Sequence, residues 1–207
     1  MGTMKAFFIL CSYILLGVAQ CDHTCKTCWV KDATKCCNEK ETVCKGASQC
    51  LAASEHCVIN GTEYQAFSKK CAVKQLCGVC VKASTIEEPN ILRIGYQCSS
   101  DDGSSLEYKR MCTEEEPENG LKCPNCYNGT NSDACKSKKS KEYVKCRGNQ
   151  LECFHYGGDL LFPNNDFRSI SAKGCITKGA CKTAFLYIPG ATEMKRNVFK
   201  CTPAETV

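Results

Sequence analysis

Short segments in which apolar and polar side chains alternate are the clearest pattern in this chain, and they predict strands rather than helices. The segments richest in aromatic and β-branched residues are 143–146, 151–156 and 184–188. The turn signals nearby are Gly157-Gly158, the stretch 163–165 and Pro189-Gly190. We therefore expect an all-β fold made of long hairpins.

An apolar run near the N-terminus differs from these segments. Residues 7–19 are thirteen apolar or small residues that follow Lys5, and Gly17 and Ala19 form a small-residue cleavage site before Gln20. The run is too short to span a bilayer as a helix. We expect residues 1–19 to be a signal peptide. Because no second apolar segment follows, we expect a secreted, extracellular protein without a membrane anchor.

Cysteine content changes the expected source of stability. The chain has 22 cysteines among 207 residues, a density typical of a disulfide scaffold. Small domains that bury little apolar surface depend on such crosslinks, and the crosslinks require an oxidising compartment. Removal of Cys11 with the signal peptide leaves 21 cysteines, an odd number.

The cysteine spacings reveal an internal repeat. Two sets of eight cysteines, beginning at Cys25 and at Cys123, are separated by seven gaps each, and six of these gaps agree within one residue. Between the sets lies the acidic segment 113–120, which holds a Pro and a Gly and no large apolar residue, as a solvated linker would. We expect domain 1 at residues 20–118 and domain 2 at residues 119–207.

The repeat resembles a known family. A Cys-x-x-Cys pair followed by six cysteines with two gaps near twenty is similar to the three-finger domain of the urokinase-receptor and lymphocyte-antigen superfamily. Segment 119–126 looks like that family's domain junction, and Lys173-Gly-Cys175 followed by Cys181 looks like its step from second to third finger. Two such domains in tandem without an anchor resemble gamma-type phospholipase A2 inhibitors and, equally, amphibian sodefrin-precursor-like factors. The resemblance implies two tandem three-finger domains.

The resemblance also implies a disulfide pairing for sixteen cysteines. Carried over position by position, the implied pairs are Cys25–Cys50, Cys28–Cys37, Cys44–Cys71, Cys77–Cys98, Cys123–Cys153, Cys126–Cys135, Cys146–Cys175 and Cys181–Cys201. Five surplus cysteines in domain 1 depart from the pattern, and they are Cys21, Cys36, Cys57, Cys80 and Cys112. Cys112 has Cys80 and Cys57 as alternative partners. The leftover thiol crosslinks two chains, is capped, or is exposed and free.

Catalytic and metal chemistry are poorly supported by the sequence. The Cys-x-x-Cys pairs lack the reducing setting that zinc or redox chemistry needs, so we expect structural disulfides and no metal or cofactor. Only three histidines are present, without a Gly-x-Ser-x-Gly elbow or a His-Glu-x-x-His helix, so we expect no enzyme. The net charge of +5 is too small to favour nucleic acid.

Binding and modification candidates remain. Asn60 and Asn128 begin Asn-Gly-Thr sequons, which predict glycosylation in a secreted chain, although Asn-Gly also favours hairpin turns. The apolar residues Leu160, Leu161 and Phe162 at a fingertip either contact a partner or fold back on the linker or domain 1. Lys138 and Lys139, in the lysine run 136–141, either attract an acidic partner or an anionic lipid surface, or line a solvated loop.

We therefore expect a secreted protein-binding protein. The favoured function is that of a phospholipase A2 inhibitor-like factor, which covers a secreted enzyme without catalytic residues of its own. The alternatives are a sodefrin-like pheromone or other extracellular signalling ligand, and a carrier or structural secretion. A leftover thiol would allow a homo-oligomer.

Overall fold

The computed structural model describes residues 23–30, 40–44, 48–73, 77–99, 112, 115–137, 141–162, 165–182, 184–185, 188–189 and 191–207. The expected signal peptide, Cys21, Cys36, Cys37, Lys138 and Lys139 lie outside these residues.

Strands make up nearly all of the regular structure in the described ranges. The strands of the first half are β1 (His23–Val30), β2 (Lys40–Cys44), β3 (Ser48–Ile59), β4 (Thr62–Val73), β5 (Cys80–Ser84) and β6 (Leu92–Ser99). Those of the second half are β7 (Glu118–Pro124), β8 (Cys126–Asn128), β9 (Tyr143–Arg147), β10 (Glu152–Phe162), β11 (Asp166–Ile176), β12 (Glu193–Pro203) and β13 (Glu205–Thr206). A short 3-10 turn, η4 (Ala180–Lys182), is the helical element of this part of the chain. The expected all-β, disulfide-rich fold is confirmed. No helix in the described ranges has the length and apolar character needed to cross a bilayer.

The first half forms three antiparallel hairpins, as a three-finger domain requires. β1 pairs with β2, β3 with β4, and β5 with β6. In the second half β7 pairs with β9, β10 pairs with β11, and β12 returns along the other side of β10. The long hairpins form because alternating side chains bury one face of each strand.

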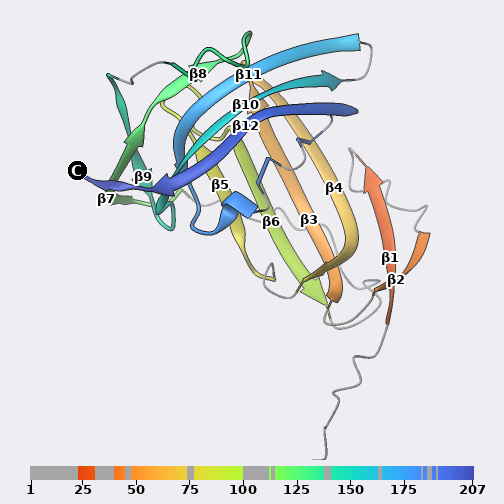
Figure 1. Ribbon diagram of the computed structural model, residues 1–207. Coiled ribbons are helices and arrows are strands. Elements are labelled where there is room, and N and C mark those ends of the chain that lie inside the picture. Colours follow the sequence, from red (N-terminus) through yellow and green to blue (C-terminus); the bar gives the residue numbers. More distant parts are fainter. Residues whose placement is uncertain are drawn as a thin grey trace, which may run out of the picture.

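One sheet runs through both halves. Its strand order is β12-β10-β11-β5-β6-β3-β4-β1-β2, and β8 adds to β11. The two halves join where β11 pairs with β5. Figure 1 shows that the strands β10, β11 and β12 curve over β3, β5 and β6, so the sheet folds back on itself. A separate sheet of β13, β7 and β9 closes the end near the C-terminus.

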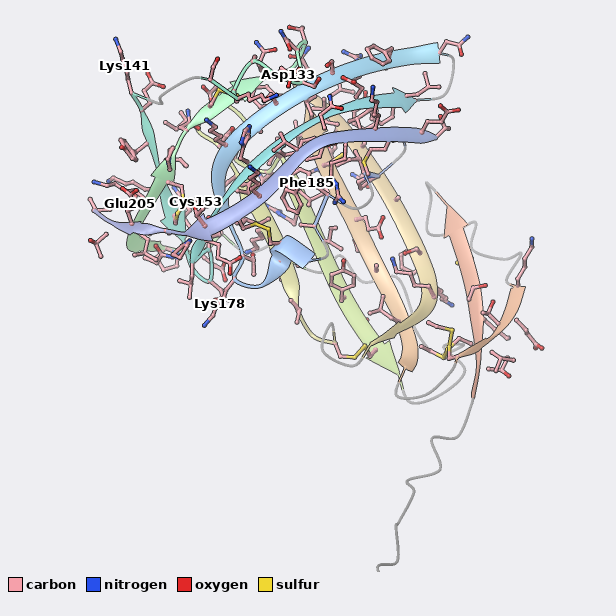
Figure 2. The ribbon with its side chains drawn as sticks, in the orientation of Figure 1. Asp133, Lys141, Cys153, Lys178, Phe185 and Glu205 are labelled. Carbon is pink, nitrogen blue, oxygen red and sulfur yellow. A yellow bond between two sulfur atoms is a disulfide. The ribbon has the colours of Figure 1, made fainter. Side chains whose placement is uncertain are left out.

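The main hydrophobic core fills the space between these two layers. The first half contributes residues such as Leu51, Ile59 and Leu92, and the second half contributes Tyr156 and Phe185, all buried. Figure 2 shows Phe185 between the β10–β12 layer and the strands of the first half. Because each layer covers the apolar face of the other, the inner faces of both halves are used for folding.

Close backbone approach strengthens the junction between the halves. An added Cβ on Gly174 of β11 would lie 2.0 Å from the backbone oxygen of Ser84 on β5. Thr177 donates its backbone N–H to the carbonyl oxygen of Lys82, and its hydroxyl oxygen accepts the N–H of Lys82. The acidic linker is also held: Glu116 lies 3.1 Å from Lys82. Glu115, Pro117 and Glu118 of the linker are exposed, and 39% of the Glu116 side chain stays exposed in its ion pair.

Eight disulfides are present in the described part. Seven of them are pairs that the three-finger resemblance implies: Cys25–Cys50, Cys44–Cys71, Cys77–Cys98, Cys123–Cys153, Cys126–Cys135, Cys146–Cys175 and Cys181–Cys201. The eighth joins the surplus residues Cys80 and Cys112. Cys28 is also disulfide-bonded, and its implied partner Cys37 lies outside the described residues. Cys57 is a buried free thiol.

Two sequence expectations about local structure are wrong. Gly157-Gly158 is not a turn: both residues lie inside β10, at a bulge opposite β12. Glycine is required there because a Cβ on Gly157 would lie 2.3 Å from the carbonyl oxygen of Ser132. Ala184 and Phe185 belong to a turn after η4 rather than to a strand, and Phe185 has a φ of 54°. The strand of this region is β12, further along the chain.

Candidate partner-binding surface

The two faces of the β11–β10–β12 layer have different roles, because side chains alternate along each strand. Leu160 and Phe162 point inward and are buried in the core shared with the first half. The prediction that they contact a partner is therefore wrong, and the alternative, that they fold back onto domain 1, is what the structure has. Burial of these large apolar side chains against β4 outweighs their exposure at a fingertip.

The outer face of the hairpin tip carries the exposed apolar group. Phe167 is 63% exposed and lies directly across the strand pair from Leu161, which is half-buried. Glu193 on β12 pairs with Leu161 from the other side. An exposed phenylalanine beside a second apolar side chain, rimmed by charge, is the composition of a protein-contact patch. We name Leu161, Phe167 and Glu193 the fingertip patch.

The first half supports the fingertip patch from below. Tyr64 of β4 stacks on Phe162, with ring centroids 4.2 Å apart. Burial raises the pKa of Tyr64, and the nearby Arg168 opposes this rise. Arg168 lies 2.9 Å from Asp166 at the start of β11. The patch is therefore held by residues of both halves, which leaves the backbone beneath Phe167 well supported.

A hydrogen-bonded network lies next to the patch on the same face. Ser169 donates its hydroxyl to Asp159 at 2.6 Å, and the backbone N–H of Ser132 donates to the Ser169 hydroxyl at 2.9 Å. Asn197 donates to the Ser132 hydroxyl at 3.0 Å. The hydrogen bond from Ser169 holds the pKa of the Asp159 carboxyl below its usual range. These contacts attach the loop 129–137 to the outer face and separate the tip from the base of the layer.

The two sequons meet at one place on the surface. Asn60 occupies the β3–β4 turn with a φ of 55°, followed by Gly61 at 71°, so Asn-Gly forms the hairpin turn that it favours. The backbone N–H of Asn60 donates to the Tyr127 hydroxyl at 2.6 Å. Asn128 accepts hydrogen bonds from Thr130 and from the backbone of Asn131. Glycosylation of Asn60 and Asn128 stays a prediction, and Asn128 lies opposite Ser171, four residues along β11 from Phe167 of the fingertip patch.

A cavity of about 500 Å³ lies at the junction of the halves, away from the patch. Its walls mix charges of both signs, including Lys82, Arg93 and Glu116, with the exposed side chains of Ile86 and Tyr143.

Two close groups of three cysteine sulfurs also exist, one in each half. Every one of those sulfurs belongs to a disulfide, so no thiolate is offered there to a metal.

His155 is not arranged as a catalytic base in the described part of the chain. Its Nε2 atom is buried without a hydrogen-bond partner, and burial together with three lysines lowers its pKa. Phe167 and Lys200 were not found from the sequence, whereas Lys136 belongs to the lysine run that the sequence singled out. Phe167 lies opposite the outward-facing Leu161, and this relationship depends on the pairing register, which the sequence alone does not give.

The described part of the chain thus offers an exposed apolar fingertip and no assembled catalytic group. No family model matches the chain. Phospholipase A2 inhibitor NAI of Notechis ater is 29% identical, over 72% of this chain and 86% of that protein. A gamma-type phospholipase A2 inhibitor chain of Laticauda semifasciata is 26% identical, over 72% of this chain and 95% of that protein. The resemblance to phospholipase A2 inhibitors is confirmed.

A third relative by sequence and one solved structure are also similar. Phospholipase A2 inhibitor 25 kDa subunit of Naja kaouthia is 28% identical, over 75% of this chain and 84% of that protein. Among solved structures, that of mouse TEX101 is 16% identical and covers 89% of this chain and all of that chain, with a TM-score of 0.33. The relatives by sequence are named as inhibitors rather than enzymes, and their alignments extend through both halves of this chain.

Proposed function

We propose that this protein is secreted and inhibits a secreted phospholipase A2 by covering the surface through which the enzyme meets its membrane. The likeness to three proteins named phospholipase A2 inhibitors, over 72–75% of this chain, carries the proposal. Inhibition by steric occlusion requires a surface that binds the enzyme and no catalytic residue. It therefore agrees with a chain in which most described cysteines are held in disulfides.

The fingertip patch is the proposed contact surface. Phe167 offers a large, rigid apolar side chain with little conformational entropy to lose, which is the type of residue that dominates binding energy at interfaces. Leu161 adds apolar area beside it, and the buried Phe162 beneath fixes the strand. The enzyme's interfacial surface is itself apolar where it meets lipid, so an apolar fingertip is complementary to it.

A titration against group I and group II secretory phospholipases A2, with fatty-acid release from vesicles as readout, tests the function. We expect saturable inhibition at submicromolar concentration. Phe167→Ala should weaken inhibition about tenfold or more, as loss of a central anchor does. Val43→Ala removes a comparably exposed apolar side chain from β2 and should leave inhibition unchanged.

The results of this titration test the inhibitory function and the contact surface separately. Absence of inhibition of both enzymes at micromolar wild-type protein would overturn the proposed function. Inhibition that is equally strong in wild type and Phe167→Ala would keep the function and reject the fingertip patch as the contact.

A further inference from the structure

A row of basic side chains crosses the base of the outer face, at the opposite end of the layer from the fingertip patch. His155 on β10 lies directly opposite Lys173 on β11 and directly opposite Lys200 on β12. Directly opposite residues on neighbouring strands have Cβ atoms about 4.5–5.5 Å apart. His155 therefore has a lysine as its cross-strand neighbour on both sides.

Lys136 joins this row from the loop 129–137. The disulfide Cys126–Cys135 closes that loop, and the backbone N–H of Cys135 donates to the Ser171 hydroxyl on β11. The Lys136 side chain, the next in sequence, is 73% exposed, and its Nζ atom lies 4.0 Å from Oδ1 of the exposed Asp133. Lys136 is also the first residue of the lysine run 136–141, so the run begins at the edge of the row.

The imidazole at the centre of the row is surrounded by cations, which oppose its protonation. In the described part of the chain, the charged groups that act on His155 are Lys136, Lys173 and Lys200, and all are cationic. Burial and these three charges lower the pKa of His155. Its Nε2 atom is buried without a hydrogen-bond partner. An anion placed over the row would offset the lysine charges and so favour protonation of the ring.

We propose that Lys136, His155, Lys173 and Lys200 form a binding site for a sulfated polysaccharide. The site is a line of cationic groups across three strands, and an extended chain carrying successive sulfate groups is complementary to it in charge. It offers several weak charge contacts in a row rather than one enclosed pocket. Such binding is electrostatic and weakens with salt.

The placement of apolar groups argues against a lipid surface as the occupant. Membrane-surface binding combines basic residues with apolar side chains that enter the bilayer. The large apolar side chains that are exposed in the described part are Val43, Ile86, Tyr143, Phe167 and Val207. Phe167 is six residues along β11 from Lys173, about 20 Å at the rise of a strand. On the strands that carry the row, the exposed large apolar side chain therefore lies at the opposite end of the layer.

The site does not depend on the proposed inhibitory function. Because about 20 Å separates the row from the fingertip patch, one molecule has room to contact an enzyme at the tip and a polysaccharide at the base. Binding to matrix polysaccharide would concentrate the protein near cell surfaces.

Calorimetric titration with a heparin oligosaccharide at two salt concentrations tests the site. The test variant carries Lys136→Gln, Lys173→Gln and Lys200→Gln. The matched control loses the same charge at exposed lysines elsewhere, through Lys40→Gln, Lys145→Gln and Lys178→Gln. We expect wild type and control to bind, with affinity that falls as salt rises, and the test variant to bind at least about tenfold more weakly. Thermal unfolding should show both variants folded.

Three results would overturn the proposal: no binding by wild type, equal loss of affinity in test and control variants, or equal affinity for desulfated oligosaccharide. Tighter binding to anionic vesicles or to a poly-glutamate peptide than to heparin would assign the row to another partner and reject a polysaccharide site.

The His155→Gln variant gives a second readout. Wild-type affinity should rise as pH falls from 7.5 to 5.5, because anion binding stabilises the protonated imidazole. The variant should keep most of its affinity at pH 7.5 and lose this dependence on pH. An unchanged pH dependence in the variant would remove His155 from the site.

Discussion

The ring of Tyr64 on β4 stacks on the ring of Phe162 on β10, with centroids 4.2 Å apart and planes 20° from parallel. This contact joins the longest hairpin of the first half to that of the second. It lies at the edge of a core to which both halves contribute. The two repeats are therefore joined by packing as well as by the β5–β11 pairing, and they should unfold together.

Phe162→Ala tests this coupling. Truncation of a buried phenylalanine should lower the free energy of unfolding by about 3–5 kcal/mol, measured by urea denaturation. A double-mutant cycle with Tyr64→Ala should give a coupling energy of about 0.5–1.5 kcal/mol. The exposed Phe167→Ala is the control and should change stability by less than about 0.5 kcal/mol. Two separate unfolding transitions in the wild type would contradict a single cooperative unit.

Gly174→Ala tests the backbone contact between β11 and β5. The added methyl would lie 2.0 Å from the Ser84 carbonyl oxygen, which is backbone and cannot rotate away. We expect a loss of about 1–3 kcal/mol in the free energy of unfolding. Gly129→Ala is the matched control, because the three atoms nearest to its methyl all belong to the Asn60 side chain rather than to backbone. Equal stability of the two variants would show that the junction adapts easily.

Cys57 accounts for the odd cysteine of the expected mature chain. It is fully buried, its thiol lies 3.9 Å from the Pro189 carbonyl oxygen, and burial raises its pKa. Sixteen described cysteines pair with one another, and Cys28 is bonded as well, so Cys57 is the free thiol among the described cysteines. We expect no thiol reactive with Ellman's reagent in the folded protein and one per chain in guanidinium. A covalent dimer that Cys57→Ser abolishes would contradict this.

Glu55 should make stability depend on pH. It is buried on β3, with Oε1 3.3 Å from the Ser68 hydroxyl and 3.8 Å from Lys70 Nζ, while Oε2 has no hydrogen-bond partner in the described part. Burial raises its pKa from 4.5, against the opposing effects of Lys70 and Ser68. Tyr96 and Cys57 also face it. The folded state therefore holds the proton more tightly than the unfolded state.

The direction of the pH effect follows from this difference. Unfolding releases the proton at pH values above 4.5, so the contribution of Glu55 to stability falls as pH rises from 4.5 through its folded pKa. Glu55→Gln should raise the urea midpoint at neutral pH and flatten its change over that range. Ser54→Ala, on the neighbouring position of β3, is the control and should retain the wild-type pH profile. A lower midpoint for Glu55→Gln at neutral pH would show that the carboxylate is stabilising.

Much of the architecture was determined by the sequence alone. The cysteine spacings revealed the repeat, and its resemblance to three-finger domains implied the pairs that the structure forms, because disulfides constrain which strands lie side by side. Alternating apolar residues predicted β9 and the first part of β10. These signals are local, or depend only on spacing, so they can be read without knowing the packing.

Tertiary structure decided which face of each strand meets solvent. Leu160 and Phe162 look like an exposed patch in sequence, yet the folding back of the sheet buries them and leaves Leu161 and Phe167 outside. The same register brings Lys173 and Lys200 to His155, although 45 residues separate His155 from Lys200 in the chain. A shift of one residue in pairing moves every side chain to the other face, and the register of strands that lie far apart in the chain is not visible in their local patterns. The disulfide framework could therefore be predicted from the sequence, whereas the surfaces available for binding depend on how the two halves pack.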